Sequence, residues 1–95
     1  MRVDFSKVLT DLDGKELEEG KKKVTLKQVC VNALMAVDQK ENIDGTEKLK
    51  RYQLATKINK GTMDVSVEEV AKIKELVGKY FSTIIVGQVY ELLEK

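Results

Sequence analysis

The sequence predicts a small, mainly α-helical protein with a β-hairpin or arm at its N-terminus. Three observations support this fold class: apolar residues recur at helical spacing after residue 24, cap-forming residues precede several of these stretches, and proline is absent. Ninety-five residues suit one hydrophobic core. We therefore expect a single domain over residues 1–95, with a hairpin or arm over 1–23 and a compact four-helix core over 24–95.

The N-terminal segment has no helical periodicity. Asp13-Gly14 is a strong two-residue turn signal, so residues 2–23 are predicted to form a hairpin or a partly ordered arm. Gly20 and the three lysines that follow it are predicted to be a solvated connector, because adjacent ammonium groups repel one another and resist burial.

The first helix is predicted to start at about Leu26. Thr25 and Gln28 have the spacing of a capping box, in which side chains satisfy backbone amides of the first turn. Apolar residues cover more of this helix than one core-facing stripe requires, which indicates a central helix or an interface. The residues of its stripe are Leu26, Val29, Cys30, Ala33, Leu34 and Val37.

The second helix is predicted over residues 46–60, between the start signal at Asp44 and the stop signal at Gly61. One face should be basic and solvated, and carries Lys50, Gln53, Lys57 and Lys60. Much of the opposite face should be buried, and carries Tyr52, Leu54, Ala55 and Ile58.

Two further helices complete the core. Ser66 and Glu69 repeat the capping box, and the third helix is predicted to end near Gly78. Ser82 can cap the last helix, inside which Gly87 would allow a neighbouring helix to approach closely. The predicted stripe of the third helix is Val67, Val70, Ile73, Val77, Tyr80 and Phe81. The buried face of the fourth is Ile85, Val86, Val89, Leu92 and Leu93.

The composition argues against an enzyme or a metal protein. No histidine is present, which removes the commonest general base and the usual zinc ligand. Cys30 lies on the most apolar helix and is expected to be a small core residue. The acids around Asp13 lack the ligand spacing of a calcium loop. We expect no catalytic residue, cofactor or metal.

Charge and hydropathy indicate a protein that stays in solution inside a cell. Seventeen basic and sixteen acidic residues nearly cancel, so no global field favours nucleic acid or membranes. No apolar run reaches the roughly 18 residues of a membrane span, and we expect no signal peptide. The single cysteine fits a reducing compartment, so the expected location is the cytoplasm.

Surplus apolar positions on the first and fourth helices suggest a partner or self-association surface. Its predicted residues are Val31, Asn32, Met35, Ile84 and Gly87. A homodimer or a different protein could cover this surface. Equally, these residues could simply complete a central helix and a well-covered end of the core.

The alternative function is a small nucleic-acid-binding regulator that uses the basic second helix. Lys50, Lys57 and Lys60 share a helical face and could contact phosphates. No aromatic platform accompanies them, and solvated lysines are common on helices, so this alternative ranks below protein binding.

Several stretches resemble small uncharacterised proteins encoded in tailed-phage and prophage genomes. They are residues 25–34 (TLKQVCVNAL), 49–58 (LKRYQLATKI), 67–74 (VEEVAKIK) and 86–90 (VGQVY), with the opening at 11–15 (DLDGK). The resemblance implies a phage-encoded accessory factor acting in a bacterial cell, by occupying a host or defence protein or by assisting virion assembly. It implies no particular functional residues.

Overall fold

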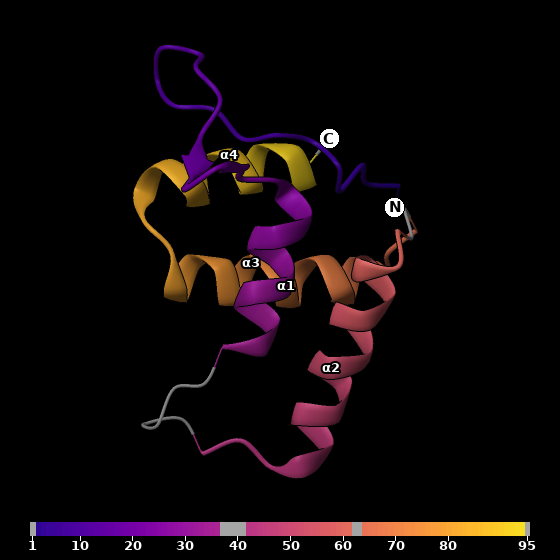
Figure 1. The fold of residues 1–95 in the computed structure, drawn as a ribbon. Helices are drawn as coiled ribbons and strands as arrows, with labels where there is room; N and C mark the ends of the chain where they lie inside the picture. The colour runs from indigo at the N-terminus through magenta and orange to yellow at the C-terminus, as the bar shows by residue number, and fades with distance from the viewer. Residues whose placement is uncertain (1, 37–41, 62–63, 95) are drawn as a thin grey trace.

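Four helices and a short N-terminal hairpin form the fold, as the sequence predicts. The computed structural model describes residues 2–36, 42–61 and 64–94. The helices are α1 (Leu26–Met35), α2 (Gly45–Asn59), α3 (Val67–Tyr80) and α4 (Thr83–Leu93). α3 packs against α1 and α4, and α1 also packs against α2. Figure 1 shows α1 crossing in front of α3, α2 running in the opposite direction to α1, and α4 with the N-terminal segment above them.

The hairpin lies around Gly20 rather than Gly14. β1 (Glu18–Glu19) pairs antiparallel with β2 (Lys22–Lys23), which places each glutamate opposite a lysine. Gly20, with φ +66°, supplies the left-handed residue that opens the two-residue turn. Residues 20–23 are exposed, as predicted, but they form the turn and the second strand of a hairpin and are not a connector, because opposite charges across the two strands favour pairing.

A second turn forms at Asp13-Gly14, where the sequence predicts one. Gly14 has φ +86°, and an antiparallel bridge joins Thr10 to Glu16 across this turn. The five residues 11–15 form the connection, so it is longer than the two-residue turn that the dipeptide signal predicts.

The arm is part of the core and is not an appendage. Val3, Phe5 and Leu9 are all buried. The Leu9 amide donates to Val24 O at 2.9 Å, and the Leu17 amide donates to Leu9 O at 2.8 Å. Backbone pairing thus holds the arm against the residues that lead into α1.

Local caps explain where three of the helices begin. The side chains of Thr25, Asp44 and Ser66 each accept a hydrogen bond from the amide three residues later. The Ser66 amide in turn donates to Glu69 Oε1 at 2.8 Å, so α3 has the complete capping box. Ser82 stands at the cap position of α4 but makes no side-chain cap hydrogen bond.

Helical spacing predicted the buried stripes with two errors. Val67, the first residue of α3, is 68% exposed. Leu76, which the predicted stripe omits, is buried on the same helix. Tyr52 is 57% exposed on α2, because the buried side of that helix is centred on Arg51, Leu54, Ala55 and Ile58. The predicted core position Val37 lies outside the described residues.

Gly78 does not end α3, which continues to Tyr80. A Cβ at position 78 would lie 2.7 Å from the hydroxyl oxygen of Tyr90 on α4, and that hydroxyl donates to Lys74 O at 2.8 Å. Gly87 is exposed, and a Cβ there would meet nothing within 4 Å. The prediction that Gly87 allows close helix packing was therefore wrong, whereas Gly78 leaves room for the Tyr90 side chain of α4.

Candidate interaction surfaces

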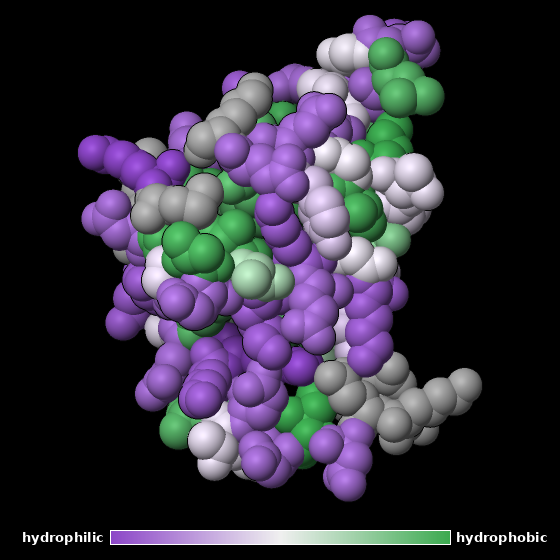
Figure 2. All heavy atoms as spheres, turned by 180° about the vertical axis from the view of Figure 1, so that it is seen from behind, coloured by the Kyte–Doolittle hydropathy of each residue, from purple (hydrophilic) through white to green (hydrophobic). Residues whose placement is uncertain are grey.

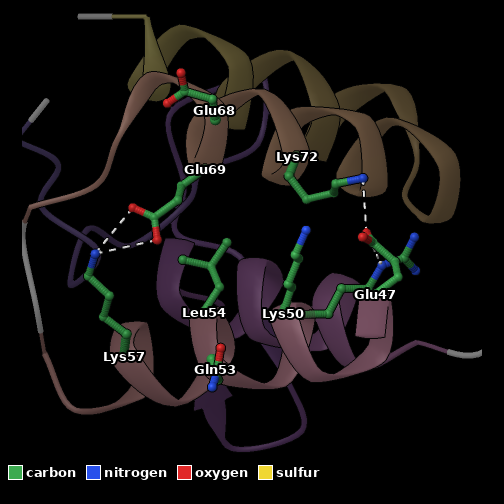
Figure 3. Close-up of a pocket in the computed structure, with 9 residues that line it drawn as sticks. Glu47, Lys50, Gln53, Leu54, Lys57, Glu68, Glu69 and Lys72 are labelled. Atoms are coloured by element: carbon green, nitrogen blue, oxygen red, sulfur yellow. Dashed lines mark hydrogen bonds and ion pairs between the residues drawn. The ribbon is translucent and has the colours of Figure 1, made fainter. Parts of the chain in front are cut away.

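A groove of about 400 Å³ lies between α2 and α3. Figure 3 shows Leu54 between the two helices and charged side chains along both walls. Its lining contains four basic and three acidic residues: Glu47, Lys50, Arg51, Gln53, Leu54 and Lys57 from α2, and Glu68, Glu69 and Lys72 from α3.

Ion pairs cross this groove at both of its ends. Lys57 Nζ lies 3.1 Å from Glu69 Oε1, and Lys72 Nζ lies 3.0 Å from Glu47 Oε1 (Figure 3). Glu47 also accepts from Nε of the buried Arg51 at 3.2 Å. The hydrogen bond from Lys72, then that from Arg51, holds the pKa of Glu47 below its usual value, although burial opposes the shift.

These pairs alter the surroundings of the predicted nucleic-acid contacts. Lys50 and Lys57 line the groove, whereas Lys60 is exposed at the C-cap of α2. Lys57 faces a carboxylate across the groove, so the basic face is partly neutralised by α3. No observation favours phosphate binding here, and the nucleic-acid alternative stays a prediction.

A second hollow, of about 440 Å³, lies where the N-terminal arm meets α1 and the end of α2. Two of the predicted interface residues, Val31 and Asn32, line it. Met35 follows one turn later on α1 and is 53% exposed. The full lining is Phe5, Ser6, Thr25, Lys27, Gln28, Val31, Asn32 and Asn59, in which Lys27 is the single charged residue.

Sequence reasoning missed the contribution of α2 to this surface. Asn59 lines the hollow, and Tyr52 and Thr56 share its helical face by their spacing of seven and three residues. α1 and α2 run antiparallel (Figure 1). Moving away from the hollow therefore leads from Asn32 to Met35 along α1 and from Asn59 to Thr56 along α2. We define the α1–α2 face as Gln28, Val31, Asn32, Met35, Tyr52, Thr56 and Asn59.

The α4 part of the predicted surface lies apart from this face. Ile84 is half-buried and Gly87 is exposed on α4, a helix that packs against α3. Neither residue lines the hollow with Val31 and Asn32. The structure therefore separates the five predicted residues into an α1 group and an α4 group.

Cys30 is buried, and the acidic residues that the structure describes form no metal-binding cluster with it. Burial raises the pKa of the Cys30 thiol to about 12, so the thiolate is scarce at neutral pH. Within residues 2–36, 42–61 and 64–94, no three cysteine or acidic side chains gather closely enough to hold a metal ion. In the same residues, no helix combines the length and apolar character needed to cross a membrane.

Comparison of the chain with protein-family models, with curated proteins and with solved structures finds no match.

Proposed function

We propose that this chain is a non-enzymatic accessory protein that binds a partner protein through the α1–α2 face. The observation that supports the proposal is the exposure of Met35 and Tyr52, each more than half exposed, on the two helices that contribute Val31, Asn32 and Asn59 to the hollow. Charged residues make up 35% of the chain, yet Lys27 is the one charge in the lining of the hollow. Depletion of charge with retained aromatic and methionine side chains is typical of the centre of protein interfaces.

The polar residues of this face suit specific recognition. Gln28, Asn32 and Asn59 offer both hydrogen-bond donors and acceptors around the apolar Val31. Such groups orient a partner, while Met35 and Tyr52 supply apolar contact area. A folded partner protein can present both hydrogen-bonding groups and apolar side chains to this face.

The resemblance to small phage and prophage proteins supports a bacterial setting. We propose that the chain acts stoichiometrically in the host cytoplasm, by occupying a host or defence protein or by assisting virion assembly. The absence of histidine from the sequence and the burial of Cys30 support a role without catalysis.

The test compares Met35→Glu with Val67→Glu. Both side chains are more than half exposed, but Val67 is on α3, outside the α1–α2 face. Tagged proteins are used to capture partners from a lysate of the host bacterium, and the purified partner is then titrated. We expect Met35→Glu to weaken binding at least about tenfold, because a desolvated carboxylate is costly, and Val67→Glu to leave it unchanged.

Size-exclusion chromatography with light scattering separates a partner protein from self-association. Binding of a different protein predicts a monomer for wild type and Met35→Glu alike. If the wild type is a dimer and Met35→Glu a monomer, a second copy covers this face instead. Equal affinity of Met35→Glu and wild type for the captured partner would contradict the proposed face.

A further inference from the structure

The loop over residues 11–15 carries the most exposed large apolar side chain among the described residues. Leu12 is 94% exposed, whereas Leu9, three residues earlier, is buried. Figure 1 shows this loop standing away from the helices, and Figure 2 shows a hydrophobic side chain at the end of the projection at the upper right. Hydrophilic side chains cover much of the remaining face in Figure 2, between smaller hydrophobic patches.

Hydrogen bonds within the loop fix its shape. The Asp11 amide donates to Lys15 O at 2.8 Å, and the Gly14 amide donates to Asp11 O at 3.1 Å. One carboxylate oxygen of Asp11 accepts from the amides of Asp13 at 2.9 Å and Lys15 at 3.0 Å. Gly14 at φ +86° adopts the left-handed conformation that this closure requires. Leu12 is thus held at the tip of an ordered turn.

The base of the loop is fastened to α4 by Gln88. The Thr10 amide donates to Gln88 Oε1 at 2.7 Å, and Gln88 Nε2 donates to Thr10 O. The side-chain amide therefore pairs with both backbone groups of Thr10, as a neighbouring strand would. On the other side, Glu16 is bridged to Thr10 and forms an ion pair with Lys23 at 2.8 Å.

We propose that this loop is a second docking element, in which Leu12 inserts into a small apolar pocket of a partner protein. The proposal rests on the proposed function, since the same protein partner is meant. Because the backbone of the loop is already ordered, binding avoids the entropy cost of ordering it, so more of the free energy of burying Leu12 contributes to affinity. An exposed leucine on a mobile loop would lack this advantage.

The acidic residues at the tip of the loop indicate what kind of side chain should surround the partner's pocket. Leu12 lies between Asp11 and Asp13, and residues 11–16 contain three carboxylates and one lysine. The Asp11 carboxylate is engaged by backbone amides, whereas Asp13 is exposed. A basic side chain at the rim of the partner's pocket would complement Asp13. The same acidity disfavours insertion into an anionic membrane or contact with nucleic acid.

A photo-crosslinking amino acid at position 12 tests the contact in cells of the host bacterium. The matched control places the same group at position 67, which is also exposed but lies on α3. We expect an adduct from position 12 with the protein that the wild type captures, and none from position 67. No adduct from position 12, or equal adducts from both positions, would overturn the proposal.

Titration of the purified partner then measures the contribution of the leucine. We expect Leu12→Ser to weaken binding about tenfold and Val67→Ser to leave it unchanged, with circular dichroism unaltered in both. Gln88→Leu should weaken binding less, and amide exchange should show the Asp13 and Lys15 amides protected in the wild type and less protected in this variant. If these amides of the wild type exchange hydrogen as fast as those of an unfolded peptide, the claim of an ordered loop is overturned.

The two proposals fail in different ways. Loss of binding in Met35→Glu with full binding in Leu12→Ser would overturn the docking role of the loop and leave the α1–α2 face supported. Loss in Leu12→Ser with full binding in Met35→Glu would support the loop and contradict the face. Asp13→Asn should reduce the affinity several-fold at low salt and little at high salt, and an unchanged affinity would overturn the basic rim.

Discussion

The close approach of Tyr90 to Gly78 makes a quantitative prediction about how α3 and α4 pack. Alanine at an exposed helical position is favoured over glycine by about 1 kcal/mol. A Cβ at position 78, however, would lie 2.7 Å from Tyr90 Oη, and nonbonded carbon contacts are usually near 3.5 Å. The tyrosine hydroxyl must move away, and its 2.8 Å hydrogen bond to Lys74 O is then lost or strained.

The two effects have similar size and opposite sign. A lost hydrogen bond costs about 1 kcal/mol, so Gly78→Ala in the wild-type chain should change the free energy of unfolding by less than about 0.5 kcal/mol. Removing the hydroxyl leaves Tyr90 Cζ as the nearest ring atom, at 3.7 Å, which is an ordinary contact. In the Tyr90→Phe background the same substitution should therefore stabilise the protein by about 1 kcal/mol.

Urea unfolding of the four proteins of this double-mutant cycle measures the interaction. We expect Tyr90→Phe alone to lower the free energy of unfolding by about 1 kcal/mol, and a coupling of about 1 kcal/mol between the two substitutions. Coupling below about 0.3 kcal/mol would refute the reasoning, because the effects would then be independent. A large stabilisation by Gly78→Ala in the wild-type chain would refute it as well.

Two further predictions concern the buried thiol and the groove between α2 and α3. Cys30 is fully buried, and burial raises the pKa of its thiol to about 12, so a disulfide reagent at pH 8 should label the folded chain far more slowly than the chain in urea. Equally rapid labelling would contradict this expectation. Glu47→Gln should cost about 2 kcal/mol, because Lys72 and the buried Arg51 both lose an ion pair with this carboxylate. Glu75→Gln, at a carboxylate 65% exposed, should cost less than about 0.5 kcal/mol. Folding lowers the pKa of Glu47 from its ordinary value of 4.5. The contribution of Glu47 to the free energy of unfolding is therefore complete above pH 4.5 and is lost as the pH falls through the folded-state pKa. Urea unfolding from pH 7 to pH 3 should show a smaller loss of stability in Glu47→Gln than in wild type.

Much of the helical framework follows from interactions between residues close in sequence. Thr25, Asp44 and Ser66 start their helices through bonds to amides three residues away, and the predicted start of α1 at Leu26 is confirmed. α2 differs from its predicted bounds by one residue at each end. Caps and helical periodicity need no tertiary partner, which is why the sequence suffices for them.

The dipeptide turn signal did not predict where the two short strands pair. Both Gly14 and Gly20 adopt positive φ, but the paired strands lie around Gly20. The dipeptide at Asp13-Gly14 gives the stronger local signal, whereas the glutamates of β1 and the lysines of β2 decide where the strands pair.

The candidate interaction surfaces likewise depend partly on local sequence and partly on tertiary packing. The sequence by itself determined the helices, the lack of histidine chemistry and the surplus of apolar residues at Val31 and Met35, since composition and periodicity act within one element. Only the tertiary structure decided that Asn59 of α2 lines a hollow together with Val31 of α1, because this depends on how the two helices meet. It also decided that Leu12 projects, on a loop fastened by Gln88, 78 residues from Thr10. Periodicity states which residues share a side of a helix, but packing alone determines which side stays in water.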